Sequence, residues 1–381
     1  MNFKTTDNEY SGKNVLIIAE IGTSHSGDIV KARELVAAAA EAGADCVKTQ
    51  IVYADEIIHP RTGLVPLPGG DIPLYDVFKK LERPFEFFAA VKEYAESRGL
   101  QFLATPFGPR SAVCLKKLSP VMVKIASPEL NYTRLLRTVS GWDLPAILSS
   151  GVSTLADIET ALSFFDRERV CLLHCVTAYP APETDYNLTL IKTLSAIFGV
   201  STGISDHSLN PCLVPLLSVS LGACAVEKHF CISRNDSGLD DPIALPAGAF
   251  AEMSAAIRRA ENQTPQAIVE EAGNFTEKKE DIRIILGDGV KRLAASESQN
   301  YGRTNRSIHA LRDIQAGEPL SSENCAVLRS EKILRAGMPP FMMEKITGCA
   351  AARFIPAGEG VRFEDFLPSS SPLSQKNTKK R

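Results

Sequence analysis

Two clusters of side chains that can bind a metal ion or move a proton lie close together in the chain. They are Ser205-Asp206-His207 and Glu227-Lys228-His229, and each follows a short apolar run typical of a buried parallel strand. Parallel neighbours end at the same edge of a sheet, about 5 Å apart. A single histidine there is more often an ordinary polar strand end. Two of them, beside carboxylates, favour a divalent metal ion shared by His207 and His229, because neutral imidazole is a common ligand.

Lysines and hydroxyl groups recur at the ends of other predicted strands. Lys48 and Lys124 lie on such strands, where a buried lysine needs an anionic partner. Four hydroxyl side chains come just after strands or at their ends: Thr105, Ser127, Ser149 and Ser205. Each alone is typical of a turn. Their recurrence at one end of successive strands indicates a phosphate site, in which each oxygen needs a donor and the charge needs a cation.

Carboxylates complete this set of side chains. Glu20 stands at a strand exit where an apolar residue would be ordinary, and Glu227 lies two residues before His229. Such groups support a metal ion or act as general acids and bases. A metal ion, a phosphate site and carboxylates together fit a lyase, an aldolase or a synthase that acts on a phosphorylated small molecule.

Eight apolar runs alternate with helical segments over residues 1–262 and must position these side chains. The runs are 15–19, 46–51, 100–104, 121–126, 146–148, 170–173, 199–204 and 223–226. The alternation predicts a (β/α)8 barrel (TIM barrel), whose active site is built from the loops after the strands. A doubly wound open sheet is the alternative, but polar residues follow every run rather than those at one switch point. An irregular connection at 52–82 is typical of a lid or a binding loop.

The pattern changes after Asn262. Residues 263–302 are expected to form a linker, and residues 303–367 contain short strand-like pieces rich in glycine. The phrase Ile-x-Ala-Gly-Glu occurs at 314–318 and again at 355–359, which predicts a small β-rich domain with two matching turns. The tail at 368–381 is rich in serine and lysine and is expected to be disordered.

Composition argues against several classes of protein. The chain has 381 residues, and its formal net charge of −3 argues against nucleic-acid binding. We expect no membrane association, because no apolar run is long enough to span a bilayer. The first residues lack the apolar core of a signal peptide. The nine cysteines are scattered without a Cys-x-x-Cys pair, and a cytoplasmic location is therefore expected.

The motifs together resemble one family, the sialic acid synthases, which includes the synthases of legionaminic and pseudaminic acids. The matching phrases occur in the family order: Ala19-Glu20-Ile21-Gly22, Val47-Lys48-Thr49-Gln50, Ala104-Thr105-Pro106-Phe107, Lys124-Ile125-Ala126-Ser127, Leu148-Ser149-Ser150-Gly151, Leu173-His174-Cys175 with Tyr179-Pro180, Ser205-Asp206-His207, and Val226-Glu227-Lys228-His229-Phe230. Residues 303–367 resemble the small antifreeze-like (SAF, β-clip) domain that follows the barrel in this family. The resemblance covers nearly the whole chain.

The resemblance implies a reaction. Phosphoenolpyruvate condenses with the open-chain aldehyde of an N-acetylated hexosamine, and the products are a nine-carbon 2-keto-3-deoxy acid and phosphate. A divalent ion, Mn²⁺ with Mg²⁺ or Co²⁺ as substitutes, would sit on His207 and His229 and polarise the aldehyde oxygen. The resemblance also implies a homodimer in which each small domain swaps onto the partner's barrel.

The resemblance assigns a role to each matching residue. Lys48, Thr105, Ser127, Ser149 and Ser205 correspond to phosphoenolpyruvate ligands, with Lys124 beside them and Thr177 in place of an asparagine that some members carry. Glu20, Gln50, Tyr179, Glu227 and Asp240 fall where the family contacts the sugar or supports the metal, and Asp206 is counted with the substrate-binding residues. Glu20, Lys48, Lys124 and Glu227 are taken as catalytic. An arginine of the swapped domain would reach the N-acyl group; Arg306 matches best, with Arg303 as the alternative.

Two departures from the family pattern leave the acceptor sugar open. The loop after Glu20 reads Ser24-His25-Ser26-Gly27 where Asn-His-x-Gly is usual, and Thr177 replaces the asparagine. The acceptor is N-acetylmannosamine, its 6-phosphate or a 2,4-diacetamido-trideoxyhexose. Two other functions compete: a synthase of 3-deoxy-octulosonate or 3-deoxy-heptulosonate phosphate, and a non-catalytic sugar-binding homologue. The antifreeze-like domain argues against the first, and the retained metal and phosphate residues argue against the second.

Overall fold

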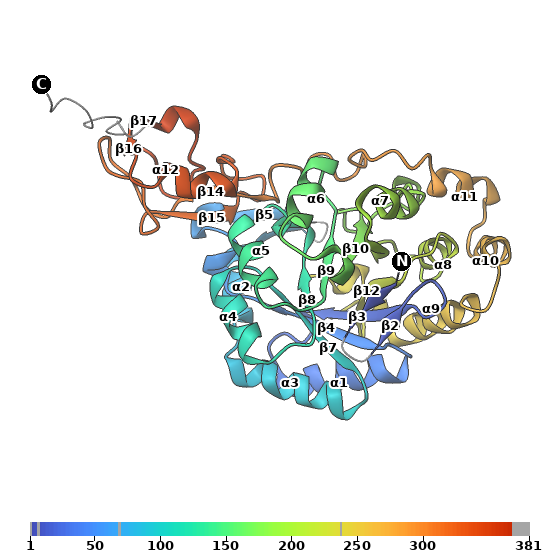
Figure 1. Ribbon diagram of the computed structural model, residues 1–381. Helices are drawn as coiled ribbons and strands as arrows, with labels where there is room; N and C mark the ends of the chain where they lie inside the picture. Colours follow the sequence, from blue (N-terminus) through green and yellow to red (C-terminus); the bar gives the residue numbers. More distant parts are fainter. Residues whose placement is uncertain (1, 6–7, 68–69, 237, 368–381) are drawn as a thin grey trace, which may run out of the picture.

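The structure is a computed structural model that describes residues 2–5, 8–67, 70–236 and 238–367. Its main part is a nearly closed parallel barrel surrounded by helices, with a small domain at one end (Figure 1). This architecture confirms the predicted (β/α)8 barrel followed by a small β-rich domain. The tail at 368–381, expected to be disordered, lies outside the described residues.

Eight parallel strands form the barrel. They are β3 (Leu16–Gly22), β4 (Cys46–Ile51), β7 (Gln101–Pro106), β8 (Val123–Ile125), β9 (Ala146–Ser149), β10 (Val170–Cys175), β11 (Ser201–Asp206) and β12 (Ala225–Cys231). Hydrogen-bonded ladders join them in the spatial order β7-β4-β3-β12-β11-β10-β9-β8, and the short β13 (Leu245–Pro246) pairs with β12. Each strand falls on a predicted run, and several continue into the polar residues that follow it. Glu20, Ser205 and Glu227 therefore lie on strands rather than in loops.

Helices form the outer layer of the barrel. They are α1 (Ile29–Glu41), α3 (Phe85–Ser97), α4 (Pro109–Lys117), α5 (Thr133–Ser140), α6 (Leu155–Leu162), α7 (Leu190–Phe198), α8 (Leu213–Ser220) and α9 (Ala247–Ala260). Asp28 caps α1, because its side chain accepts a hydrogen bond from the backbone N–H of Val30. Thr154 and Asp157 form a capping box on α6. These caps fix where each helix begins after the loop that carries site residues.

Alternation along the strands sorts side chains between the barrel interior and the helices. On β3, Ile17 and Ala19 pack with the helices, whereas Leu16 and Ile18 belong to a separate inner cluster. Successive strand residues point to opposite faces, so the next inner position after Ile18 is Glu20. The interior is therefore apolar at its base and polar toward the carboxyl ends of the strands.

A short hairpin that sequence reasoning missed covers the apolar base of the barrel. It consists of β1 (Phe3–Lys4) and β2 (Glu9–Tyr10). Phe3 and Tyr10 are buried in the inner cluster together with Leu16 and Leu103. The hairpin thus shields the end of the barrel opposite the polar layer.

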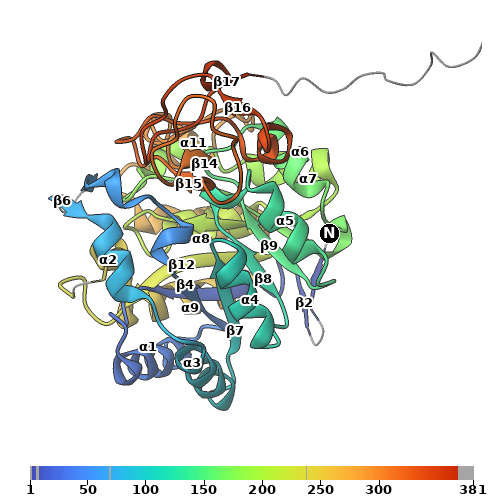
Figure 2. The ribbon, with the colours of Figure 1, turned by 90° about the vertical axis from the view of Figure 1, so that its left-hand side faces the viewer.

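The connection at 52–82, predicted to be irregular, contains regular structure. Two short 3-10 helices, η1 (Ala54–Glu56) and η2 (Pro60–Thr62), precede a hairpin of β5 (Leu64–Leu67) and β6 (Gly70–Pro73) and then α2 (Leu74–Leu81). Val65, Leu74 and Phe78 pack with Ile57 and Ile58 in a separate apolar cluster. The segment lies at the side of the barrel, below the small domain (Figure 2).

The expected linker at 263–302 is partly helical and lies against the barrel. It contains α10 (Pro265–Ala272) and α11 (Lys279–Leu286), and α10 packs on α8. Past α11 the chain runs along the barrel, where Asn300 donates a hydrogen bond to the carbonyl oxygen of Thr177. Such contacts show that this segment is part of the packed structure.

The small domain is built from β14 (Arg306–Ala310), β15 (Cys325–Arg329), β16 (Ala350–Ala351), β17 (Phe366–Leu367) and α12 (Met343–Ile346). The two repeated phrases form matching turns, with Gly317 at φ 86° and Gly358 at φ 87°, and Ile314 pairs with Ile355 in an antiparallel bridge. The domain contacts the barrel of its own chain, where the backbone of Arg329 bonds to that of Ile57. The resemblance implies such contacts between two chains, and the homodimer stays a prediction.

Among the residues that the structure describes, no helix combines the length and the apolar character needed to cross a bilayer.

Candidate active site

A cavity of about 910 Å³ opens at the carboxyl ends of the barrel strands. It brings together every predicted site residue except two. The residues that line it are Glu20, Lys48, Gln50, Thr105, Lys124, Ser127, Ser149, Thr177, Tyr179, Ser205, His207, Glu227, His229 and Asp240. Those that lie on strands occupy the inner face of the barrel, above the apolar cluster at its base. The exceptions are Asp206 and Arg306.

The two histidines lie side by side within this cavity. The ring centroids of His207 and His229 are 5.5 Å apart, and the Tyr179 ring stacks on His207 at 4.3 Å. His207 Nδ1 is 2.8 Å from the carbonyl oxygen of Val176, so Nδ1 carries the proton and the lone pair is on Nε2. Burial lowers the pKa of His229 to about 3, which keeps this ring neutral. Burial also opposes the charge on His207, but the nearby Cys175 Sγ and the Val176 carbonyl oxygen outweigh it and raise the pKa of His207. The His229 ring therefore holds a lone pair that can bind a metal ion, and the His207 ring offers Nε2 when it is deprotonated.

The donor set fits a divalent ion that substrate also ligates. Within the described ranges, no group of three or more histidine, cysteine or carboxylate side chains is arranged to hold a metal ion. Two imidazoles, with the Asp240 carboxylate 3.8 Å from His229 Nδ1, leave coordination positions for substrate oxygens. The backbone carbonyl that fixes the His207 tautomer is the kind of outer partner that orients metal ligands.

Buried charges surround the floor of the cavity. Lys48 Nζ lies 3.2 Å from Glu20 and 3.3 Å from Glu227, and Lys124 Nζ lies 3.8 Å from Glu227. Burial opposes the charge on Lys48, but the two carboxylates outweigh it and raise its pKa. Lys124 has less compensation, and burial lowers its pKa to about 8. It donates a hydrogen bond of 2.6 Å to Ser149. Lys124 is thus the cation most in need of an anionic ligand.

Hydroxyl side chains line the part of the cavity next to Lys124, which we call the hydroxyl hollow: Thr105, Ser127, Ser149 and Thr177. Gly151 packs closely behind it, since a Cβ atom there would collide with Thr177 Oγ1 at 2.1 Å and Ser127 Oγ at 2.9 Å. Gly151 itself donates its backbone N–H to Ser127 Oγ. The hydroxyls of Thr105 and Thr177 are buried and have no hydrogen-bond partner among the described residues. Such groups cost stability unless a ligand satisfies them, so the hollow has the chemistry of an anion cradle.

Asp206 lies outside the cavity, contrary to its placement with the substrate-binding residues. It is on the outer face of β11, where Lys228 Nζ approaches its carboxylate to 2.5 Å. Its other oxygen accepts a hydrogen bond from the Tyr186 hydroxyl, which in turn accepts one from the backbone N–H of His207. Asp206 therefore positions the strand end that bears His207. The period-2 alternation from Ser205 to His207 is the signal that would have placed it outward.

Comparison with known proteins agrees with this geometry. The NeuB family model matches residues 35–268. The chain belongs to the NeuB family. The SAF domain model matches residues 305–367. Spore coat polysaccharide biosynthesis protein SpsE of Bacillus subtilis is 35% identical over 97% of this chain and 98% of its own length. N,N'-diacetyllegionaminic acid synthase of Campylobacter jejuni is 31% identical over 83% of this chain and 91% of its own length.

The crystal structure of the Bacillus subtilis protein has the same architecture. It superposes with a TM-score of 0.79 at 33% identity, over 96% of this chain and 99% of that one. The similarity covers the barrel and the SAF domain, and it confirms the resemblance drawn from the sequence motifs.

Arg306 does not reach the cavity of this NeuB chain. Its side chain is fully buried, lies 2.9 Å from Glu129 and donates to the carbonyl oxygens of Ile57 and Phe107. All of these groups belong to the same chain, and together they occupy the donors of the guanidinium. The expectation for Arg306 concerns the partner's site in a domain-swapped dimer, so it stays a prediction. Arg303, the alternative, is exposed and is not among the described residues that line the cavity, although the adjacent Thr304 is.

The arginine of the SAF domain that does line the cavity is Arg329. Its guanidinium lies 2.6 Å from Glu129 and 3.7 Å from Glu331, and it stacks near the Phe107 ring. Sequence reasoning missed it because its partner, Glu129, is remote in the chain. No local pattern around Arg329 indicated the contact.

Glu297 is a second residue that sequence reasoning missed. It is buried, and its Oε2 accepts hydrogen bonds from the backbone N–H groups of Val152 and Thr177. These groups lie in the loops after β9 and β10; Ser149 is the last residue of β9, and Thr177 is in the loop after β10. The segment taken as a linker therefore holds two active-site loops in place.

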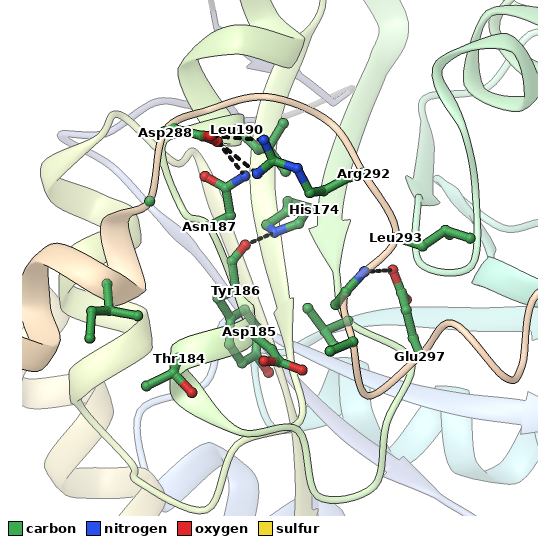
Figure 3. Close-up of a pocket in the computed structure, with 15 residues that line it drawn as sticks. His174, Thr184, Asp185, Tyr186, Asn187, Leu190, Asp288, Arg292, Leu293 and Glu297 are labelled. Atoms are coloured by element: carbon green, nitrogen blue, oxygen red, sulfur yellow. Dashed lines mark hydrogen bonds and ion pairs between the residues drawn. The ribbon is translucent and has the colours of Figure 1, made fainter.

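A second cavity of about 320 Å³ lies between the β10–α7 connection and the segment after α11 (Figure 3). His174 lines it, because this residue is on the outer face of β10 and bonds through Nε2 to the carbonyl oxygen of Tyr186. Burial lowers the pKa of His174 to about 3. His174, which belongs to the matching phrase Leu173-His174-Cys175, is therefore separate from the His207 and His229 pair.

Proposed function

We propose that this protein condenses phosphoenolpyruvate with the open-chain aldehyde of an N-acylated hexosamine, giving a nine-carbon 2-keto-3-deoxy acid and phosphate. The observation that carries the proposal is the placement of two different sites in one cavity. The imidazole pair of His207 and His229 lies in the same cavity as a buried lysine beside a hydroxyl hollow. The names of the relatives, which are synthases of nine-carbon sugar acids, support the same reaction.

The hollow beside Lys124 binds phosphoenolpyruvate. Lys124 and Ser149 offer a cation and a hydroxyl, and Thr105, Ser127 and Thr177 offer further donors to the phosphate or carboxylate oxygens. Lys48 stays cationic between Glu20 and Glu227 and holds both carboxylates in fixed positions. This arrangement meets the negative charge of the substrate without long-range reorganisation.

The acceptor aldehyde binds at His207 and His229. A divalent ion on this pair would supply Lewis-acid polarisation of the aldehyde oxygen. Tyr179 holds the His207 ring by stacking, while Glu20 and Gln50, bonded to each other at 2.7 Å, face the sugar hydroxyls. The C2=C3 double bond of phosphoenolpyruvate opens as C3 bonds to the aldehyde carbon, whose oxygen takes the carbonyl electron pair and a proton. Water adds to C2 and loses a proton. The bond from C2 to the phosphate oxygen then breaks, which leaves the 2-keto group and inorganic phosphate.

Chelation tests the role of the ion. With phosphoenolpyruvate and N-acetylmannosamine, we expect phosphate release that EDTA abolishes and that added Mn²⁺ restores, with Mg²⁺ or Co²⁺ as weaker substitutes. Neither imidazole alone can polarise the aldehyde as a divalent charge does. Full turnover in a metal-free, chelator-treated sample would contradict the metal hypothesis. A homodimer and a cytoplasmic location remain predictions.

Replacing Gly151 with alanine should raise the KM for phosphoenolpyruvate by at least about 10-fold, because the new methyl group would collide with Thr177 Oγ1 and Ser127 Oγ and displace these two donors. Gly151 does not have a positive φ, so the substitution adds no backbone strain. The matched control is Gly248→Ala in α9, where a Cβ meets no atom within 4 Å. An unchanged KM in the Gly151→Ala variant would show that the anion binds elsewhere.

A further inference from the structure

The segment that joins the barrel to the SAF domain is bonded to both backbone groups of one active-site residue. We call residues 287–304, between the end of α11 and the SAF domain, the connecting segment. Glu297 Oε2 accepts the backbone N–H of Thr177 at 2.9 Å, and Asn300 Nδ2 donates to the Thr177 carbonyl oxygen at 2.7 Å. The connecting segment therefore fixes the backbone of Thr177, whose buried hydroxyl has no partner within the described part of the chain.

The loop after β9 is held in the same way at Val152. Its backbone N–H donates to Glu297 Oε2 at 2.9 Å, and its carbonyl oxygen accepts a hydrogen bond of 3.0 Å from Asn305 Nδ2. Asn305 is the first residue that the SAF domain model matches. One carboxylate oxygen thus joins two active-site loops, and the first residue of the SAF domain holds one of them from the other side.

The backbone conformation of Val152 shows why this loop has to be held. Val152 has a φ of 44°, in the left-handed region that a β-branched residue rarely adopts, and its side chain is fully buried. Such a conformation persists only where the surrounding contacts impose it. The preceding residue, Gly151, donates its backbone N–H to Ser127 Oγ at 3.0 Å. A relaxed Val152 would therefore disturb the hydroxyl hollow.

The connecting segment is itself anchored to the barrel at its first residues. Asn187, in the β10–α7 connection, accepts the backbone N–H of Gly289 at 2.8 Å and donates to the carbonyl oxygen of Val290 at 3.0 Å (Figure 3). Farther along, Glu297 is buried and its second oxygen accepts the backbone N–H of Ala294. Hydrogen bonds to a carboxylate are stronger than those between neutral groups, so Glu297 is a firm point of attachment.

We propose that Glu297 and Asn305 are positioning residues for phosphoenolpyruvate, and that binding of this substrate depends on the junction between the barrel and the SAF domain. The inference rests on the proposed function. Neither residue is among the described residues that line the active-site cavity, so each acts through the backbone of Val152 or Thr177. The two side chains keep the hydroxyl hollow preformed, which spares the substrate the cost of ordering it.

Replacement of Glu297 tests the first part of the proposal. The dissociation constant of phosphoenolpyruvate is measured by calorimetry without an acceptor sugar. Glu297→Ala should raise it by about 10-fold or more, because both loops lose their common partner and a small misplacement of binding groups is costly. Glu297→Gln keeps an oxygen that accepts both N–H groups, so it should stay within about 3-fold of the parent protein.

Each outcome of this experiment has a separate meaning. Unchanged binding in Glu297→Ala overturns the inference and leaves the proposed function intact. Binding by Glu297→Gln as weak as that by Glu297→Ala also overturns it, because the hydrogen bonds would then not explain the loss. If the parent protein binds no phosphoenolpyruvate, the proposed function and this inference both fail.

Glu261→Ala is the matched control for a general loss of stability. Glu261 Oε1 accepts the backbone N–H of Val15 at 2.8 Å and lies 2.7 Å from Arg258, at the amino end of β3. Both alanine variants should lower the melting temperature, because each leaves a backbone N–H without its partner. Only Glu297→Ala should weaken phosphoenolpyruvate binding. An equal loss of affinity in Glu261→Ala would overturn the positioning role.

Replacement of Asn305 tests the dependence on the SAF domain. Asn305→Asp keeps the oxygen that accepts the backbone N–H of Gly302 at 2.7 Å but loses the donor to Val152, and it should raise the dissociation constant of phosphoenolpyruvate by about 10-fold. The matched control is Asn324→Asp, since Asn324 Oδ1 accepts the backbone N–H of Ser321 at 2.8 Å within the SAF domain. Equal affinities of the two variants would overturn the role of the SAF domain.

Discussion

Replacing His229 with alanine should lower turnover by at least about 1,000-fold, because it removes one of the two imidazoles that hold the ion. The remaining His207 is fixed by its bond to the carbonyl oxygen of Val176 and cannot move to compensate. Folding should be little affected, since the His229 ring makes no hydrogen bond in the described structure apart from its approach to Asp240. The measurements are steady-state phosphate release and Mn²⁺ affinity by calorimetry.

The matched control for this variant is His25→Asn. His25 is buried next to Phe87, and its Nδ1 accepts the backbone N–H of Gly27, a bond that an asparagine oxygen can keep. It does not line the active-site cavity. We expect His25→Asn to bind Mn²⁺ and turn over as the parent protein does. Normal Mn²⁺ affinity in His229→Ala would mean that the ion is held by other groups.

Replacing Lys124 with methionine should raise the KM for phosphoenolpyruvate by about 100-fold, because the cation beside the hydroxyl hollow is lost. The pH dependence of the KM for phosphoenolpyruvate is the more specific test of this role of Lys124. Burial lowers the pKa of Lys124 to about 8, so the free protein carries this charge below pH 8 and loses it as the pH rises through 8. The KM of the parent protein should therefore be flat near pH 7 and rise above pH 8. The methionine variant should show a high KM without this rise.

The thermal stability of the Lys124→Met variant shows whether a raised KM for phosphoenolpyruvate comes from weaker binding or from unfolding. A lysine whose pKa is lower in the folded protein than its ordinary value makes the free energy of unfolding increase between about pH 8 and pH 10.5. At pH 7 the charged Lys124 therefore lowers the free energy of unfolding. In the variant, Glu227 still has Lys48 as its cationic partner. The melting temperature of Lys124→Met at pH 7 should not be lower than that of the parent protein. A flat pH profile in the parent protein would show that Lys124 is not the titrating group.

The sequence by itself determined the barrel and most of its site. Each buried strand is a short apolar run, and helices fill the intervals, so the alternation could be read without any long-range information. Parallel strands in a barrel place their carboxyl ends together, which brings Lys48, Lys124, His207 and His229 into one cavity although they are far apart in the chain. The repeated phrase around Gly317 and Gly358 likewise predicted the two matching turns of the small domain.

Only the tertiary structure decided which residues serve the site indirectly and which complete it. Asp206 is adjacent to His207 in sequence, but strand alternation turns it outward onto Lys228. Arg306 and Arg329 both lie on strands of the small domain, and both pair with Glu129. Of the two, Arg329 lines the cavity and Arg306 does not. Glu297 and the apolar residues Ile57, Val65 and Phe78, which line the cavity, belong to segments that fold against the barrel from remote parts of the chain. Local sequence carries periodicity and turn chemistry, whereas contacts between distant segments arise only when the domains pack together.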